Sequence, residues 1–271
     1  MKFLKNKTLW FIVYGIVITV AFLYVLFPSD IVRGRLEEAL TASGFVLKTE
    51  SLRSSFPFGI KMQNVSLNSE SSATSYFQGK SIDVQFNPSS FFRKSKSVGI
   101  DGQAYGGNFS GRFGFASFSK LYPPQEGKLI IRDIDLGKYA FIKTLLGRDI
   151  TGRASGDWTF KNSAERGSSG TIHLSLKRGY FSLAEPFLGL SRIDFNRGDI
   201  KASIQNDRII LEKMELFGQQ LDCLLNGEIS LAGDFKQSQL NLNGEMIIAE
   251  KKVKMKINIS GTMANPAVRY I

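Results

Sequence analysis

The chain has 271 residues and a formal net charge of +11, with 35 basic and 24 acidic side chains. It contains one histidine, His173, and one cysteine, Cys223, so it lacks the side chains for a His/Cys zinc cluster or an internal disulfide. The basic balance suits anionic partners such as lipid headgroups, lipopolysaccharide-like molecules or acidic protein surfaces, and it equally suits simple solubility.

An uncharged apolar run over residues 9–27 follows Lys2, Lys5 and Lys7. As a helix this run of about 19 residues spans about 28 Å, close to the thickness of the hydrocarbon core of a membrane. The lysines before it predict a cytoplasmic N-terminus. A cleaved signal peptide is the first alternative, but residues 26–30 offer no small-x-small cleavage site, and a buried soluble helix is the second.

We therefore expect two regions in the chain. Residues 1–28 form a cytoplasmic tail and a single-pass anchor in the inner membrane, and residues 29–271 form a periplasmic β-rich domain, either one unit or two similar halves. Nucleic acid is not an expected partner, because binding it would need the opposite orientation.

A short amphipathic helix is predicted over residues 31–40, where Val32, Leu36 and Leu40 follow a helical spacing. Ser29 or Asp30 would cap its start and Gly44 would stop it. Its apolar stripe needs cover, so the helix lies either beside the membrane or across the open end of a sheet.

From Phe45 onward the apolar period changes to two, which predicts strands with one apolar face. Turn signals recur at intervals of about ten residues, the spacing of meandering hairpins, so the sheet should be antiparallel. The clearest of these signals are Asn206-Asp207, Asn226-Gly227 and Asn243-Gly244.

Two helical interruptions are expected, one over residues 138–146 that ends at Gly147 and a second over residues 184–190. Neither recurs at the spacing of β-α-β units, so a parallel doubly wound sheet is not expected. Polar stretches at residues 69–75 and 161–169 are typical of exposed loops.

Two motifs suggest chemistry that their context does not favour. The glycine-rich residues 102–111 resemble a phosphate loop, but strand patterns flank them on both sides, so they indicate a hairpin or bulge. Asp133 and Asp135 would share one strand face and could hold a metal or act in acid/base chemistry. Without a third ligand nearby, the simpler interpretation is a solvated strand edge with Asp135 as a helix cap.

Residues 91–96 combine phenylalanines with cations, which suits a membrane surface or a solvated turn. We find no nucleophile elbow and no serine-lysine motif. The sequence therefore predicts no catalytic, cofactor-binding or metal site, and we expect a protein that is not an enzyme.

The order of these features resembles the bacterial type II secretion system protein N family and, more distantly, AsmA-like periplasmic proteins. The resemblance covers nearly the whole chain and rests on the anchor, the amphipathic segment and a set of weak motifs in order. These motifs are residues 54–67, 84–88, 105–111, 133–136, 146–156 and 259–270. It implies a secretion accessory protein that works through contacts with other secretion-system proteins, and it brings no catalytic residues.

The predicted fold is mainly β: a transmembrane helix followed by a long curved antiparallel sheet, either an open groove or a sandwich, with a few short helices. Two functions fit. The first is a non-enzymatic component of a type II secretion system, and the second is a lipid-binding or lipid-transfer protein with an apolar β-groove. A lipid groove should leave Phe, Leu and Ile side chains accessible, whereas a scaffold should bury them in a core.

Overall fold

We describe the protein from a computed structural model. The described residues are 10–11, 14–15, 18–19, 22, 26–42, 44–56, 58–70, 75–87, 96–117, 124–163, 167–187, 190–233, 235–248 and 253–270.

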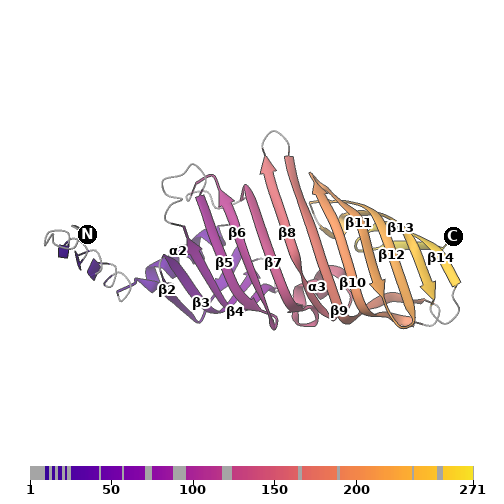
Figure 1. The fold of residues 1–271 in the computed structure, drawn as a ribbon, viewed down its shortest axis with the longest axis horizontal. Helices are drawn as coiled ribbons and strands as arrows, with labels where there is room; N and C mark the ends of the chain where they lie inside the picture. Colours follow the sequence, from indigo (N-terminus) through magenta and orange to yellow (C-terminus); the bar gives the residue numbers. More distant parts are fainter. Residues whose placement is uncertain are drawn as a thin grey trace, which may run out of the picture.

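The described part of the chain forms a single 15-stranded antiparallel sheet in which nearly every strand pairs with its neighbour in sequence (Figure 1). Only the N-terminal edge departs from this order, because β1 and β2 both pair with β3. The strands are β1 (Phe45–Lys48), β2 (Ser51–Ser55), β3 (Gly59–Ser69), β4 (Ser75–Phe86), β5 (Lys96–Ala104), β6 (Gly107–Phe115), β7 (Glu126–Asp135), β8 (Arg153–Ser163), β9 (Gly167–Phe187), β10 (Leu190–Gln205), β11 (Arg208–Phe217), β12 (Leu221–Ser230), β13 (Gln239–Ile248), β14 (Val253–Thr262) and β15 (Pro266–Tyr270). The predicted antiparallel, mainly β fold is confirmed, and of the two architectures we left open it is the open sheet.

The registers place the apolar side chains of successive strands on one face. Ile131 of β7 pairs with Phe109 of β6, and Leu174 of β9 pairs with Ile200 of β10. Further along, Cys223 of β12 pairs with Met246 of β13. Because paired residues point to the same side of a sheet, one apolar face continues along the molecule.

This face is buried at its two ends. An N-terminal cluster consists of Leu47, Leu52, Met62 and Val65, and the apolar side chains of Val32, Leu36 and Leu40 pack against it. A larger C-terminal cluster spans β8 to β14 and consists of Ala154, Leu176, Phe195, Ala202, Leu211, Leu216, Leu221, Cys223, Leu225, Leu242, Met246 and Ile257.

The predicted amphipathic helix is present as α2 (Ser29–Thr41) and contacts β1 and β2. It lies across the N-terminal end of the sheet, one of the two positions we expected. The expected cap is wrong, because Pro28 occupies the N-cap position and no side chain caps the helix. Gly44 follows the helix with a left-handed φ of +79°.

The second predicted helix is confirmed as α3 (Ala140–Leu146), which ends at Gly147 in the left-handed conformation. A 3-10 turn, η3 (Leu136–Lys138), leads into it, and another, η4 (Phe235–Gln237), lies between β12 and β13. Leu136 packs against the C-terminal cluster, so η3 lies on the apolar side of the sheet. In Figure 1 α3 is drawn behind the strands.

The contacts of α3 show that the sheet curls around its apolar face. α3 contacts both β4 and η4, although the strands from β5 to β11 lie between β4 and β12 in the sheet order. In a flat sheet β4 and β12 would be about 38 Å apart at about 4.8 Å per strand, while a helix of this length spans only about 10 Å. The apolar face is therefore concave.

Three predictions of local structure are wrong. Of the helix predicted over residues 184–190, the described residues 184–187 and 190 are strand: β9 continues to Phe187 and pairs with the start of β10. The strand tolerates Pro186 because β8 pairs with β9 only as far as Lys177, which leaves the outer edge of β9 free of ladder bonds at Pro186.

The other two are turn signals. Gly227 and Gly244 lie inside β12 and β13, whereas the signal at Asn206-Asp207 does mark the β10–β11 turn. A Cβ at Gly227 would lie 2.2 Å from the carbonyl oxygen of Asn241, and a Cβ at Gly244 would lie 1.9 Å from that of Leu224. These glycines permit a close approach of neighbouring strands.

The predicted anchor over residues 9–27 falls mostly outside the described residues. Among the residues that the structure does describe, no helix has the length and apolar character needed to cross a membrane. Of the described aromatic side chains of this segment, Trp10, Phe11, Tyr14 and Phe22 are exposed, whereas Phe27 packs against the N-terminal cluster.

Candidate functional site

The middle of the concave face, between the two buried clusters, is the candidate site. We define this central apolar face by side chains of β6 to β9 that the registers place together: Phe109, Phe113, Leu129, Ile131, Trp158, Phe160, Ile172 and Leu174. None of these side chains is fully buried. Trp158 is 37% exposed. The described strands all belong to one sheet, so no second sheet covers this region within the described part of the chain.

Glycines on the same face shape its surface. A Cβ at Gly102 would lie 2.5 Å from the ring of Phe109, and a Cβ at Gly127 would lie 2.4 Å from the ring of Phe160. The aromatic rings therefore lie over neighbouring glycines, in the manner of aromatic side chains that shield glycine in a sheet. At these positions the apolar surface consists of aromatic rings packed on glycine backbone.

A chain of aromatic rings connects α3 with strands of the N-terminal part of the sheet. The ring centroids follow one another at 5.5 Å from Phe45 to Tyr76, 5.0 Å from Tyr76 to Phe141, 5.9 Å from Phe141 to Tyr139, and 4.7 Å from Tyr139 to Tyr105. These contacts join β1, β4, α3 and the β5–β6 turn.

Tyr105 anchors this aromatic chain. Its hydroxyl accepts a hydrogen bond from the backbone N–H of Gln78 at 2.7 Å. Burial raises the pKa of Tyr105 to about 12, and burial also raises the pKa of Tyr139. Both phenols therefore stay neutral at physiological pH.

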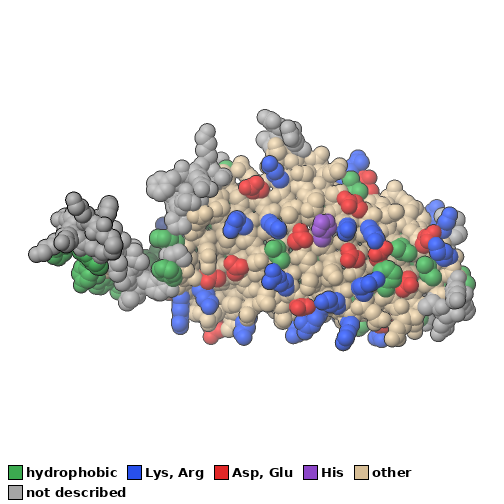
Figure 2. Space-filling model, in the orientation of Figure 1, with side chains coloured by type: hydrophobic (Ala, Val, Ile, Leu, Met, Phe, Trp, Pro, Cys, Tyr) green, Lys and Arg blue, Asp and Glu red, His purple; other side chains and the backbone are tan. Residues whose placement is uncertain are grey.

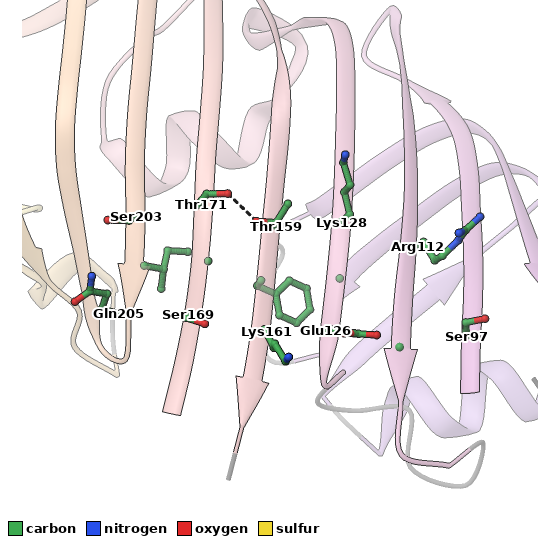
Figure 3. Close-up of a pocket in the computed structure, with 15 residues that line it drawn as sticks. Ser97, Arg112, Glu126, Lys128, Thr159, Lys161, Ser169, Thr171, Ser203 and Gln205 are labelled. Atoms are coloured by element: carbon green, nitrogen blue, oxygen red, sulfur yellow. Dashed lines mark hydrogen bonds between the residues drawn. The ribbon is translucent and has the colours of Figure 1, made fainter. Parts of the chain in front are cut away.

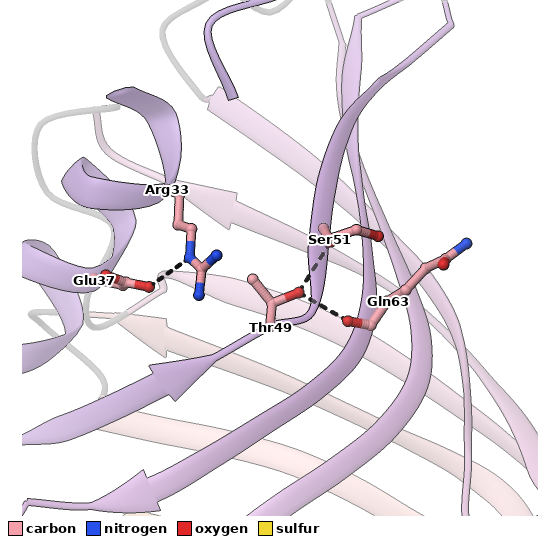
Figure 4. A network of polar contacts seen from close by, with 5 residues as sticks. All are labelled: Arg33, Glu37, Thr49, Ser51 and Gln63. Atoms are coloured by element: carbon pink, nitrogen blue, oxygen red, sulfur yellow. Dashed lines mark hydrogen bonds and ion pairs between the residues drawn. The ribbon is translucent and has the colours of Figure 1, made fainter. Parts of the chain in front are cut away.

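The N-terminal end is held by polar contacts beside α2 (Figure 4). The Thr49 hydroxyl lies 3.0 Å from the carbonyl oxygen of Ser51 and 2.9 Å from that of Gln63, which ties the β1–β2 connection to β3. On α2 itself, Arg33 and Glu37 form an ion pair at 2.9 Å.

The opposite face of the sheet is polar, and it carries mixed basic and acidic side chains toward the viewer in Figure 2. Two hollows lie on it. A trough of about 620 Å³ crosses β5 to β10 near the ends of these strands (Figure 3), and a hollow of about 450 Å³ lies over β3 to β7. The Thr159 and Thr171 hydroxyls hydrogen-bond to each other at 2.7 Å within the trough.

The structure separates the residues that the sequence analysis singled out. His173 lies on the polar face, with its Nδ1 3.7 Å from the Asp157 carboxylate. Cys223 is buried, and burial raises its pKa to about 11. The two are not neighbours in the sheet, since they lie on β9 and β12.

The aspartate pair does not form a site. Asp133 has a left-handed φ of +53° in a bulge of β7, and its backbone N–H donates to the Ser155 hydroxyl. Asp135 caps η3 by accepting from the Gly137 N–H at 3.1 Å, which confirms the predicted capping role. Among the described residues, no group of three or more His, Cys, Asp or Glu side chains could hold a metal ion.

The glycine-rich residues 102–111 contain the β5–β6 hairpin, with Tyr105 and Gly106 at positive φ in the turn. The hairpin interpretation is therefore confirmed. Residues 91–95 of the aromatic and basic segment lie outside the described residues.

The sequence analysis missed the glycines as part of the site. Gly111, Gly127, Gly156 and Gly170 all fall in phase with the apolar residues of their strands. The signal was available in the sequence, because a glycine that replaces an apolar residue in a period-two pattern marks a position on the same face.

No family model, curated protein or solved structure matches this chain. The resemblance to the type II secretion system protein N family therefore stays a prediction from the sequence motifs.

Proposed function

We propose that this protein binds lipid acyl chains on its central apolar face. One observation carries the proposal: a concave face lined by Phe, Leu, Ile and Trp side chains is left only half-buried in the middle of the sheet. Exposed apolar surfaces of this kind in folded proteins mark binding sites for apolar ligands or partners.

The energetics suit a flexible apolar ligand. Each methylene that leaves water contributes about 0.8 kcal/mol, so about ten methylenes on this face would contribute roughly 8 kcal/mol before the cost of ordering the chain. The ring-covered glycines suit such a ligand, because the face presents few polar groups that would need a partner.

A protein-contact scaffold, our first expectation from the family resemblance, would bury these side chains in a core. The half-buried Leu129, Phe160 and Leu174 favour the lipid-binding alternative instead. Membership of a type II secretion apparatus stays a proposal that rests on the order of the sequence motifs.

The location is part of the proposal. Residues 9–27 would anchor the chain in the inner membrane with a cytoplasmic N-terminus, and the sheet would lie in the periplasm. An anchor of this kind would hold the concave face near a source of lipid.

The test uses two neighbouring residues of β7 that point to opposite faces. Leu129 lies on the central apolar face, and Ile130 lies on the polar face, where it pairs with Ser110 and Asp157. Full-length wild type, Leu129→Glu and Ile130→Glu are purified in the same mild detergent, and co-purifying phospholipid is counted by mass spectrometry.

We expect Leu129→Glu to lose most of the bound lipid and Ile130→Glu to keep it. Lipid associated with the N-terminal segment is common to all three proteins, so it cancels in the comparison. Equal lipid in both folded variants would contradict the proposal.

A further inference from the structure

The trough on the polar face contains a pair of cations that the sheet does not neutralise. Arg112 of β6 and Lys128 of β7 are directly opposite each other in the register, and both side chains are exposed. Like charges at such positions destabilise a sheet. Among the described residues, neither cation has a carboxylate within ion-pair distance.

Two other cations of this face do form ion pairs with carboxylates. Lys213 forms an ion pair with Glu215 at 2.8 Å, and Lys254 forms one with Glu245 at 2.8 Å. In the trough, a third cation, Lys161, is opposite Glu126 in the register. The described side chains of the trough therefore carry an excess of positive charge around Arg112 and Lys128.

Hydroxyl groups line the same trough as these cations. The trough is also lined by Ser97, Thr159, Ser169, Thr171 and Ser203, so it offers neutral donors beside the charged ones. Figure 3 shows Arg112, Lys128 and the threonine pair along the same stretch of the sheet. A guanidinium, an ammonium and hydroxyls together form the donor set that recognises phosphate oxygens.

Gly127, Phe160 and Gly170, which pair with one another on the apolar face, also contribute to the lining of the trough. The trough and the central apolar face therefore have Phe160 in common.

We propose that the trough binds a phosphate-bearing group, with Arg112 and Lys128 as the charged ligands and the hydroxyls as additional donors. A volume of about 620 Å³ accommodates more than a phosphate ion and suits a phosphate ester that carries a glycerol or sugar. The residues of this site differ from those that test acyl-chain binding, so the two proposals can fail separately.

The test compares two pairs of opposed cations on the same face. Arg112→Ser/Lys128→Ser removes the pair in the trough, and Lys201→Ser/Lys213→Ser removes the directly opposed pair on β10 and β11, outside the trough. Both double variants lower the net charge by the same amount. Binding of glycerol 1-phosphate and of dihexanoyl phosphatidylglycerol to the full chain in a zwitterionic detergent is measured by calorimetry.

We expect the trough variant to weaken binding of at least one probe by tenfold or more and the control variant to leave it within twofold of wild type. Loss for both probes identifies the phosphate ester as sufficient, and loss for the lipid alone identifies a lipid headgroup as the ligand. Equal weakening in both variants would show attraction by net charge only and would overturn the proposal, as would the absence of binding to wild type. Leu129→Glu should leave glycerol 1-phosphate binding unchanged, which separates this site from the acyl-chain site.

Discussion

Individual glycines decide how closely the strands of the apolar face approach one another. Gly156 of β8 is an example, because a Cβ there would lie 2.0 Å from the backbone carbonyl oxygen of His173 on β9. The obstacle is backbone within a paired ladder, so a side chain cannot be accommodated by a rotamer change. By contrast, a Cβ at Gly34 of α2 would meet nothing within 4 Å.

The same substitution should therefore have opposite effects at these two glycines. Gly156→Ala should lower the free energy of unfolding by about 1–3 kcal/mol, because the ladder must shift. Gly34→Ala should raise it by about 0.5–1 kcal/mol. Gly34 lies inside a helix, and alanine at this position reduces the conformational freedom of the unfolded chain. Urea denaturation measures both changes, and a loss of stability for Gly34→Ala would contradict the open surroundings of that residue.

Cys223 should make stability depend on pH in the alkaline range. Burial raises the pKa of its thiol to about 11 from an ordinary value of 9.0. The unfolded chain therefore releases the thiol proton at a lower pH than the folded chain does. The contribution to stability is complete below about pH 9 and is lost as pH rises toward 11.

Between pH 8.5 and 9.8 this loss should amount to about 1 kcal/mol in the wild type. The measurement is urea denaturation at both pH values, with Cys223→Ala as the control, because alanine has no proton to release. An equal loss of stability in the two proteins would show that the thiol is not the titrating group.

At the scale of secondary-structure elements, α2 replaces a missing second layer at the N-terminal end of the sheet. Val32, Leu36 and Leu40 cover the N-terminal cluster, while Ile31 on another side of the helix is 68% exposed. The helix lacks a side-chain cap, so packing and not capping holds it in place.

Truncation of the packed side of α2 should therefore destabilise the N-terminal end of the sheet. Leu36→Ala should lower the free energy of unfolding by about 1–3 kcal/mol, somewhat less than for a fully buried leucine, and Ile31→Ala should change it by less than about 0.5 kcal/mol. Hydrogen exchange of the β1 and β2 amides provides the local measurement. Protection that is equal in the two variants would mean that α2 does not stabilise these strands.

The sequence predicted these elements well where side-chain period alone determines them. The spacing of Val32, Leu36 and Leu40 predicted α2, and the alternation in β7 and β9 predicted strands with one apolar face. Prediction failed where tertiary pairing overrides local preference. Asn226-Gly227 has the composition of a turn, yet Gly227 lies within β12 because two neighbouring strands approach closely there.

At the scale of the whole molecule, the sheet curls without closing over its middle. The contacts of α3 with β4 and η4 require this curvature, and the sequence could not predict it, because no local pattern records which distant strands a short helix will touch. The sequence predicted an apolar face, but only the structure shows that this face is buried at its ends and half-buried in the centre.

Trp158 provides a direct probe of the central apolar face. The chain has two tryptophans, Trp10 and Trp158, so Trp10→Phe leaves a single fluorophore on that face. In a matched control, Trp10→Phe/Trp158→Phe/Thr159→Trp moves the fluorophore by one residue to the polar face, because successive strand residues point to opposite sides.

The measurement that tests acyl-chain binding most directly is quenching of this fluorescence by phospholipid with brominated acyl chains, compared with the same lipid without bromine. We predict bromine-dependent quenching at position 158 and little or none at position 159. Equal quenching at both positions, or none at position 158 in the folded protein, would contradict the proposal that the central apolar face binds lipid.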